Sequence, residues 1–301
     1  MNTALKKAHW LILLLTLVTP LWAGAGQTIV AAVDEDIIQD YQLFVGTRDP
    51  LKITHFAGPG ARRDVVELVL LQQALHLGGY QGSVTLRPEN SYLRTLKLVN
   101  DGQVAISGAP KWLEDMQPYE DQIYISSAIV HEGDFIVGIY TRPDNRKALD
   151  ATSLDKVRQL TAASNSHWKA DVSTLKSLGI GRIYYSTYWV QIVRMVVAGR
   201  ADITLAPFQS TPGMKIKVNN LALVPIPGIK VSLPGSRHWP VSKQHPQGEA
   251  IFNALQKGIA ILEANHIIRQ AYEECGFFHP GVQDWQLLNA PHASTTQPIT
   301  H

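Results

Sequence analysis

The sequence has 301 residues, 45% of them hydrophobic and 17% charged, a balance typical of a globular protein with one large domain or two smaller ones. Its 27 basic and 25 acidic residues nearly cancel, so bulk charge does not favour nucleic acid and we expect no nucleic-acid partner. The single cysteine, Cys275, excludes an internal disulfide and a thiolate metal cluster.

Residues 1–25 have the layout of a secretory signal peptide. A basic start precedes a short apolar run broken by Pro20, and an A-x-A pattern stands at 23–25. Such a run is too short for a good membrane span, although a retained anchor is the alternative. We therefore predict cleavage before Gly26 and a periplasmic protein whose mature chain has 25 basic and 25 acidic residues.

From residue 51 the hydrophobic pattern alternates between strands and helices. Glycines at the ends of the helical stretches, such as Gly78 and Gly79, are typical helix terminators. The β-α-β-α-β order predicts a parallel sheet with right-handed crossovers. The expected elements are a strand over 51–58, a helix over 61–79, a strand over 82–88, a helix over 91–102 and a strand over 103–110.

The middle of the chain repeats this order. The phrase "NDGQVAISGAP", ending at Pro110, returns as "VAGRADITLAP", ending at Pro207, and both read as helix, glycine, strand and Ala-Pro. We interpret the repeat as the third strand of each of two similar lobes. The expected elements here are strand 157–164, helix 166–179, strand 181–187, helix 187–199 and strand 201–208.

Two extended apolar stretches, 129–145 and 221–235, connect the lobes in this interpretation. The predicted fold class is therefore α/β, with two lobes whose central, mostly parallel sheets are joined by a two-strand hinge. The predicted domains are the signal peptide 1–25, lobe I over 26–138 with 228–290 returning to it, lobe II over 139–227 and a disordered tail over 291–301.

From about residue 51 to 278 this layout resembles the type II periplasmic solute-binding proteins, the amino-acid-receptor-like family 3 of ABC transport systems. The stretch "AGRADITLAP" resembles that family's second-lobe Gly-Arg-x-Asp strand, and "IYISSAIVHEGDFIVGIY" resembles its strand entering the hinge. The resemblance implies that the lobes close on a small-molecule ligand without catalysing a reaction and without a cofactor. It also implies a monomer that presents its ligand to a membrane permease or sensor kinase.

The candidate ligand-binding residues follow strands or begin helices, because ligands of such folds sit beyond the carboxyl ends of parallel strands and near helix N-termini. Each has an ordinary alternative: a solvated first-turn arginine, a helix cap, a surface-packed aromatic residue or, for Asp202, the structural carboxylate that we favour slightly. The candidates are Arg62, Arg63, Tyr92, Trp112, Asn165, Ser166, Asp202 and Thr204.

One departure from the family concerns the ligand. Amino-acid receptors carry a Thr-x-x-Arg whose arginine grips the ligand's α-carboxylate, whereas this chain has no arginine between Lys111 and Arg142. Arg62, Arg63 or Lys111 would have to substitute, or the ligand differs. The predicted function is capture of a small polar or anionic ligand. An enzyme on the same frame and a degenerate clamp that binds another protein are the alternatives, although no G-x-S-x-G, Walker A or H-E-x-x-H motif occurs.

Overall fold

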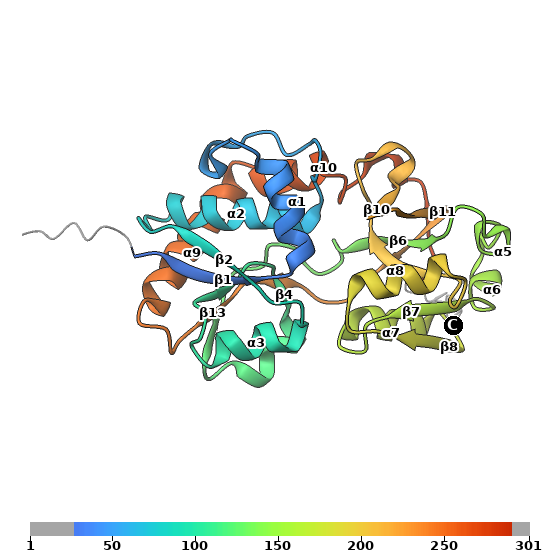
Figure 1. Ribbon diagram of the computed structural model, residues 1–301, viewed down its shortest axis with the longest axis horizontal. Coiled ribbons are helices and arrows are strands. Elements are labelled where there is room, and N and C mark those ends of the chain that lie inside the picture. The colour runs from blue at the N-terminus through green and yellow to red at the C-terminus, as the bar shows by residue number, and fades with distance from the viewer. Residues whose placement is uncertain (1–26, 291–301) are drawn as a thin grey trace, which may run out of the picture.

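The computed structural model describes residues 27–290, so the predicted signal peptide and the predicted disordered tail lie outside the described residues. The chain forms two α/β lobes that lie side by side, each built around its own sheet (Figure 1). None of the helices within 27–290 is long and apolar enough to cross a membrane.

The first lobe contains a five-stranded sheet with the order β2-β1-β3-β13-β5. Strands β1, β2 and β3 are parallel, and β13 is antiparallel to both β3 and β5. A separate two-stranded ladder pairs β4 with β12. The strands span Ile29–Val33 (β1), Val84–Pro88 (β2), Ile106–Ser107 (β3), Lys111–Trp112 (β4), Ile123–Ile125 (β5), Arg237–His238 (β12) and Pro240–Ser242 (β13).

The strand expected over 51–58 is wrong. That stretch begins with the short 3-10 helix η1 (Pro50–Lys52) and continues as irregular chain. The side-chain amide of Gln73 donates to the carbonyl oxygens of Pro50 and Ile53, so their backbone oxygens are satisfied without a sheet. The apolar run "IVAAV" forms β1 instead, which lies between β2 and β3 in the sheet.

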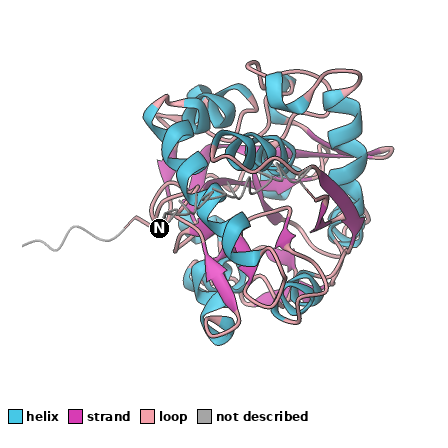
Figure 2. Cartoon of the chain, turned by 90° about the vertical axis from the view of Figure 1, so that its left-hand side faces the viewer, coloured by secondary structure: helices cyan, strands magenta, loops and turns pink. Residues whose placement is uncertain are grey.

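Helices lie on both sides of the first-lobe strands (Figure 2). Helix α2 is buried on nearly every side, because α1, α9 and α10 pack around it. Gly258 allows the closest approach of α9 to α2, since a Cβ there would lie 1.7 Å from the carbonyl oxygen of Ala74. The first-lobe helices are α1 (Glu35–Val45), α2 (Arg63–Leu77), α3 (Tyr92–Asn100), α4 (Leu113–Met116), η2 (Gln117–Tyr119), α9 (Gly248–Ala264) and α10 (Ile267–Glu274).

The second lobe contains the sheet β10-β11-β6-β9 and the parallel pair β7-β8. A parallel bridge between Ala162 and Ile203 connects β7 to the chain just before β9. The strands are β6 (Ile136–Thr141), β7 (Thr161–Ser164), β8 (Arg182–Tyr185), β9 (Thr204–Pro207), β10 (Ile216–Val218) and β11 (Leu221–Ser232). The helices are α5 (Arg146–Leu149), α6 (Leu154–Val157), α7 (Lys169–Ser177), α8 (Trp189–Val197) and η3 (Pro212–Met214).

The repeated phrase of the sequence occupies matching places in the two lobes. Helix α3 leads through Gly102 to β3, and α8 leads through Gly199 to β9. Both glycines have a left-handed backbone, with φ of +69° and +72°, which a side chain would strain. The two-lobe interpretation is therefore confirmed. The strands of each lobe are mixed, however: β1, β2 and β3 are parallel in the first lobe, whereas in the second β7 and β8 are parallel and the sheet β10-β11-β6-β9 is antiparallel.

Strands β6 and β11 pair in antiparallel fashion where the chain passes between the lobes, as in the predicted two-strand hinge. The chain then crosses once more. After α10 it continues through η4 (Pro280–Val282) to β14 (Gln286–Leu287), which pairs with β11, and Trp285 packs edge-on against Phe208. The expectation that 228–290 stays with lobe I is wrong for this last part, because these residues help to cover the second lobe's core.

Candidate functional site

Charged side chains from both lobes meet where the lobes face each other. The first lobe supplies residues at the end of β1, the start of α2, the β4-β12 ladder and α4, and the second supplies the first turn of α7. This group, called the junction cluster, consists of Asp34, Arg63, Asp64, Glu67, Lys111, Asp115, Lys169, Asp171 and Arg237.

Arg237 is 7% exposed and lies on β12 beside Trp112 of β4. One terminal nitrogen donates to the carbonyl oxygen of Pro110, while Nε has no hydrogen-bond partner among the described residues. The guanidinium lies over the rings of Trp112 and Phe135, 5.2 and 5.4 Å from their centres. Burial, and the nearby charge of Arg63, lower the pKa of Arg237. Within residues 27–290, this cation has therefore lost water without gaining a carboxylate in hydrogen-bond contact.

Lys111, on β4, is 5% exposed. Its Nζ lies 4.4 Å from the centre of the Tyr92 ring, and it forms no ion pair or hydrogen bond within residues 27–290. Burial lowers its pKa to about 8, although Asp34 pulls in the opposite direction. Lys111 is thus a second buried cation without a direct anionic partner.

Arg63 opens α2 and is the third buried cation. It contacts Asp64, its NH1 lies 3.6 Å from Glu67 Oε1, and its guanidinium lies 4.9 Å from the Phe135 ring centre. Burial works against its charge, but Asp64 and Glu67 outweigh burial and raise its pKa. Its Nε and NH1 have no hydrogen-bond partner among the described residues. Among the described residues, Arg63 therefore has carboxylate partners for its charge but keeps N–H groups without a hydrogen-bond acceptor.

Arg62 is fully occupied by carboxylates. Its three guanidinium nitrogens lie 2.7–2.8 Å from Asp36, Asp40 and Asp64. The first two carboxylates are on α1, so Arg62 ties α1 to the start of α2. Each of its three guanidinium nitrogens thus already pairs with a carboxylate, and these contacts favour a structural role for this predicted ligand-binding residue.

Tyr92 and Trp112 lie at the edge of the junction cluster. The Tyr92 hydroxyl donates to Asp115 at 2.8 Å and accepts from the backbone N–H of Trp112 at 3.3 Å. The Trp112 ring packs on Phe135 with centres 4.8 Å apart. Both predicted aromatics therefore hold the buried charges in place.

The second lobe reaches this cluster through α7. Lys169 Nζ lies 3.0 Å from Asp115 Oδ1. Burial raises the pKa of Asp171 to about 7, against the pull of Arg237 and Arg63. Across the junction, burial raises the pKa of Asp34 to about 6, against the pull of Lys111. Both lobes thus present carboxyl groups that gain and lose protons near neutral pH.

The other predicted residues of the second lobe fall into two groups. Asn165 donates to the carbonyl oxygen of Thr187 and accepts from the backbone of His167, so it shapes the loop before α7, where Ser166 is exposed. These two lie beside the junction.

Asp202 accepts instead from the backbone and hydroxyl of Thr161 and lies 3.4 Å from Lys147, at the end of β7 opposite α7. Thr204 is buried within β9, in register with Tyr140 of β6. The structure therefore brings Arg63, Tyr92 and Trp112 together but leaves Asp202 and Thr204 inside the second lobe.

Sequence reasoning missed most of the charges at the junction. Arg237 lies near Lys111 because β12 pairs with β4, and no local sequence motif predicts this pairing. Asp171 and Lys169 lie in the first turn of a helix whose position was predicted, so the rule that helix starts line the cleft could have found them.

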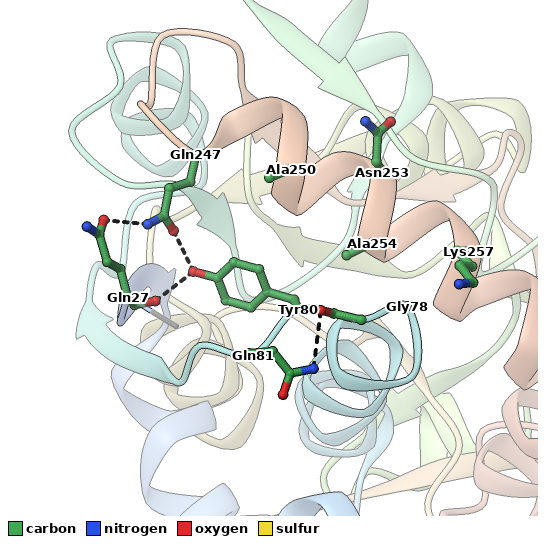
Figure 3. A pocket seen from close by; sticks show the side chains of 10 residues that line it. Gln27, Gly78, Tyr80, Gln81, Gln247, Ala250, Asn253, Ala254 and Lys257 are labelled. Carbon is green, nitrogen blue, oxygen red and sulfur yellow. Dashed lines mark hydrogen bonds between the residues drawn. The ribbon is translucent and has the colours of Figure 1, made fainter. Parts of the chain in front are cut away.

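A separate surface pocket of about 610 Å³ lies on the first lobe, between the end of α2 and α9. The Tyr80 hydroxyl there lies 2.6 Å from the carbonyl oxygen of Gln27 and 2.5 Å from Gln247 Oε1 (Figure 3). Lys257 is the sole charged residue in its lining. Its lining includes none of the junction cluster, so it is not the candidate site. Within residues 27–290 no three His, Cys, Asp or Glu side chains are placed to hold a metal ion.

No protein-family model and no curated protein matches the sequence. Solved structures do match it. The periplasmic VFT2 domain of BvgS from Bordetella pertussis has 15% identity and a TM-score of 0.55, and the match covers 83% of this chain and 94% of that one. The amino acid ABC transporter substrate-binding protein AbpA from Streptococcus pneumoniae, bound to L-arginine, has 13% identity and a TM-score of 0.53 over the same shares.

An ancestral arginine-binding protein bound to arginine has 10% identity and a TM-score of 0.51, covering 83% of this chain and 99% of that one. The chain has the two-lobed fold of the type II periplasmic binding proteins. At these identities the likeness shows the type II fold alone.

Proposed function

We propose that this protein is a periplasmic solute-binding protein whose lobes close on a small solute with an acidic group. The observation that carries the proposal is the pair of buried cations Lys111 and Arg237, neither of which contacts a carboxylate among the described residues. Burying a charge without a partner is costly, and sites that accept an anion tolerate that cost. Arg63 adds unsaturated N–H donors beside them.

The solute's acidic group would lie between Arg237 and Lys111, with Trp112 and Phe135 forming the apolar wall beneath Arg237. A planar carboxylate suits a guanidinium because it can accept two parallel hydrogen bonds. The carboxyl groups of Asp34 and Asp171 face the same region from opposite lobes. When ionised, these two carboxyl groups would repel a dianion. They would favour a solute that carries a hydrogen-bond donor or an amino group as well as its acidic group.

Closing the lobes would take the solute out of water and bring α7 against it. The loaded protein would then be recognised by a membrane permease or a sensor kinase. The similar solved structures come from both kinds of system: a substrate-binding protein of an ABC transporter and a periplasmic domain of BvgS. We propose a monomeric binding protein, with the permease or kinase contacting the surface of the closed lobes.

A thermal-shift screen tests the proposal. At a solute concentration 100-fold above Kd, binding stabilises the folded state by about 2.7 kcal/mol, which raises Tm by about 5 °C or more for a chain of this size. We expect shifts from small carboxylic acids and none from their neutral amides. Arg269→Gln, at an exposed arginine of α10, is the matched control for Arg237→Gln. Shifts from amides, or equal shifts in both variants, would contradict the assignment.

An acid-base enzyme on the same frame is the second candidate. Asp34 and Asp171 have pKa values raised to about 6 and 7, which places both groups in the range useful for proton transfer at neutral pH. Consumption of a solute that binds, followed by NMR over hours, would favour the enzyme. Recovery of the unchanged solute would favour the binding protein.

A further inference from the structure

One ion pair joins the two lobes directly. Of the ion pairs within residues 27–290, the pair between Lys169 of α7 and Asp115 of α4 is the one that connects a second-lobe helix to a first-lobe helix. Nζ and Oδ1 are 3.0 Å apart. Because both partners belong to the protein, this contact can form whenever the lobes approach.

The two partners are buried to very different degrees. The Asp115 side chain is 4% exposed and the Lys169 side chain is 54% exposed. The Tyr92 hydroxyl, also in the first lobe, donates a hydrogen bond of 2.8 Å to Asp115 and so holds its carboxylate in one orientation. The hydrogen bond and charge of Asp115 raise the pKa of Lys169, as expected when an ammonium gains from the contact. Lys169 therefore extends from the surface of the second lobe to a buried carboxylate whose position a first-lobe hydrogen bond fixes.

We propose that Lys169 and Asp115 form an ionic latch that holds the two lobes closed in the absence of a solute. The latch uses neither Lys111 nor Arg237, so it leaves the cations of the proposed solute site free. Its effect on solute affinity rests on the proposed function: a closed state populated in advance strengthens binding in proportion to its population. The latch itself does not depend on any solute.

Distances between spin labels on the two lobes, measured without any added solute, test the latch. Leu93→Cys on α3 and Lys176→Cys on α7 place labels at exposed positions of the first and second lobe. The native Cys275 is buried, and burial raises the pKa of its thiol to about 12, so it does not compete for the label.

We expect the labelled protein to show mainly a short distance, and Lys169→Gln to raise the population at a longer distance about five-fold, which is the scale of a partly exposed ion pair. Lys169→Arg should restore the short distance. Lys217→Gln, at an exposed second-lobe lysine outside the junction, should leave the distribution unchanged. Since Lys169 is on the surface, its variants should fold normally.

A mainly long distance in the unaltered protein would overturn the latch, and so would a Lys169→Gln distribution identical to that of Lys217→Gln. Failure of the proposed function has a different signature. In that case the labels would show a latch-dependent closed state, while no small acid would shift Tm in any variant.

Discussion

The two lobes share one plan and differ at their facing ends. The strand order β2-β1-β3-β13-β5 of the first lobe matches β8-β7-β9-β6-β11 of the second, with three parallel strands followed by antiparallel ones in each. In the first lobe, Asp34 follows β1 and Lys111 lies shortly after β3. In the second lobe, Asn165 follows β7 and the chain then enters α7. The shared plan sets where the strand ends meet, and the residues at those ends set the chemistry.

Two glycines, one from each lobe, differ sharply in the space around them. Helix α2 of the first lobe lies against α9 so closely that only hydrogen fits at Gly258, where a Cβ would lie 1.7 Å from a backbone oxygen. Gly181 of the second lobe has nothing within 4 Å of the same position. Gly258 therefore marks a close helix-helix contact in the first lobe, whereas Gly181 is exposed and lies just before β8.

The largest expected effect tests this packing difference. Gly258→Ala should lower the free energy of unfolding by about 3 kcal/mol, because the added methyl group forces α9 away from α2. Gly181→Ala should change it by less than about 0.5 kcal/mol. Urea denaturation measures both. Similar losses for the two variants would contradict this difference in local packing.

The next effect concerns solute binding, which we propose depends on cations of the first lobe. Arg237→Gln should weaken binding of the best acid about 30-fold, the cost of losing a charge-assisted hydrogen bond of roughly 2 kcal/mol. Asp202→Asn, at the far end of the second lobe, should leave the affinity unchanged. Calorimetric titration measures both dissociation constants. If Asp202→Asn weakened binding as much as Arg237→Gln, the site would be misplaced.

A smaller effect concerns Asp171, whose pKa burial raises from 3.8 to about 7. The folded state therefore holds a proton that the unfolded chain releases. Its contribution to stability is complete below pH 4 and is lost as the pH rises through about 7. Asp171→Asn should remove that loss and make the protein more stable than the unaltered one at pH 8 by about 1 kcal/mol, after allowance for solvent access.

Melting temperatures between pH 4 and 8 measure this effect. A neutral control is Asp155→Asn, at an exposed second-lobe aspartate. If the Asp171→Asn variant kept the pH dependence of the unaltered protein, the carboxyl group would not be buried at the junction.

The last effect is of similar size and has the opposite dependence on pH. Burial works against the ionised form of Asp202, but hydrogen bonds from Thr161 and the charge of Lys147 outweigh it and lower its pKa. Its contribution is present above the unfolded pKa and is lost as the pH falls below it. Asp202→Asn should therefore cost about 1 kcal/mol of stability at pH 7, and the difference should shrink toward pH 3. A constant difference from pH 3 to 7 would argue against this linkage.

Much of the fold could be predicted from the sequence because its helices end at glycines and its strands are short apolar runs. The helices around Gly102 and Gly199 are the clearest cases. The first strand was misplaced because the apolar run 51–58 resembles β1, and only the hydrogen bonds of Gln73 distinguish irregular chain from a strand there. Such long-range contacts leave no local pattern.

The candidate site could be predicted only in part for the same reason. Arg63 was found because it opens a helix that the hydrophobic pattern predicts, and Trp112 because it follows the strand expected over 103–110. Arg237 was not, because it reaches the junction through a two-residue ladder formed by segments far apart in the chain. Arg62 was predicted as a ligand-binding residue, yet three aspartates occupy it, and no sequence signal separates it from its neighbour Arg63.

The most direct test of the central claim is a calorimetric titration of the unaltered protein with the best small carboxylic acid and with its neutral amide. We predict that the acid binds at least 30-fold more tightly than the amide, and that Arg237→Gln removes most of this difference. Equal affinities for acid and amide, or a preference for the acid that Arg237→Gln leaves intact, would contradict the claim that the buried cations of the junction hold the solute.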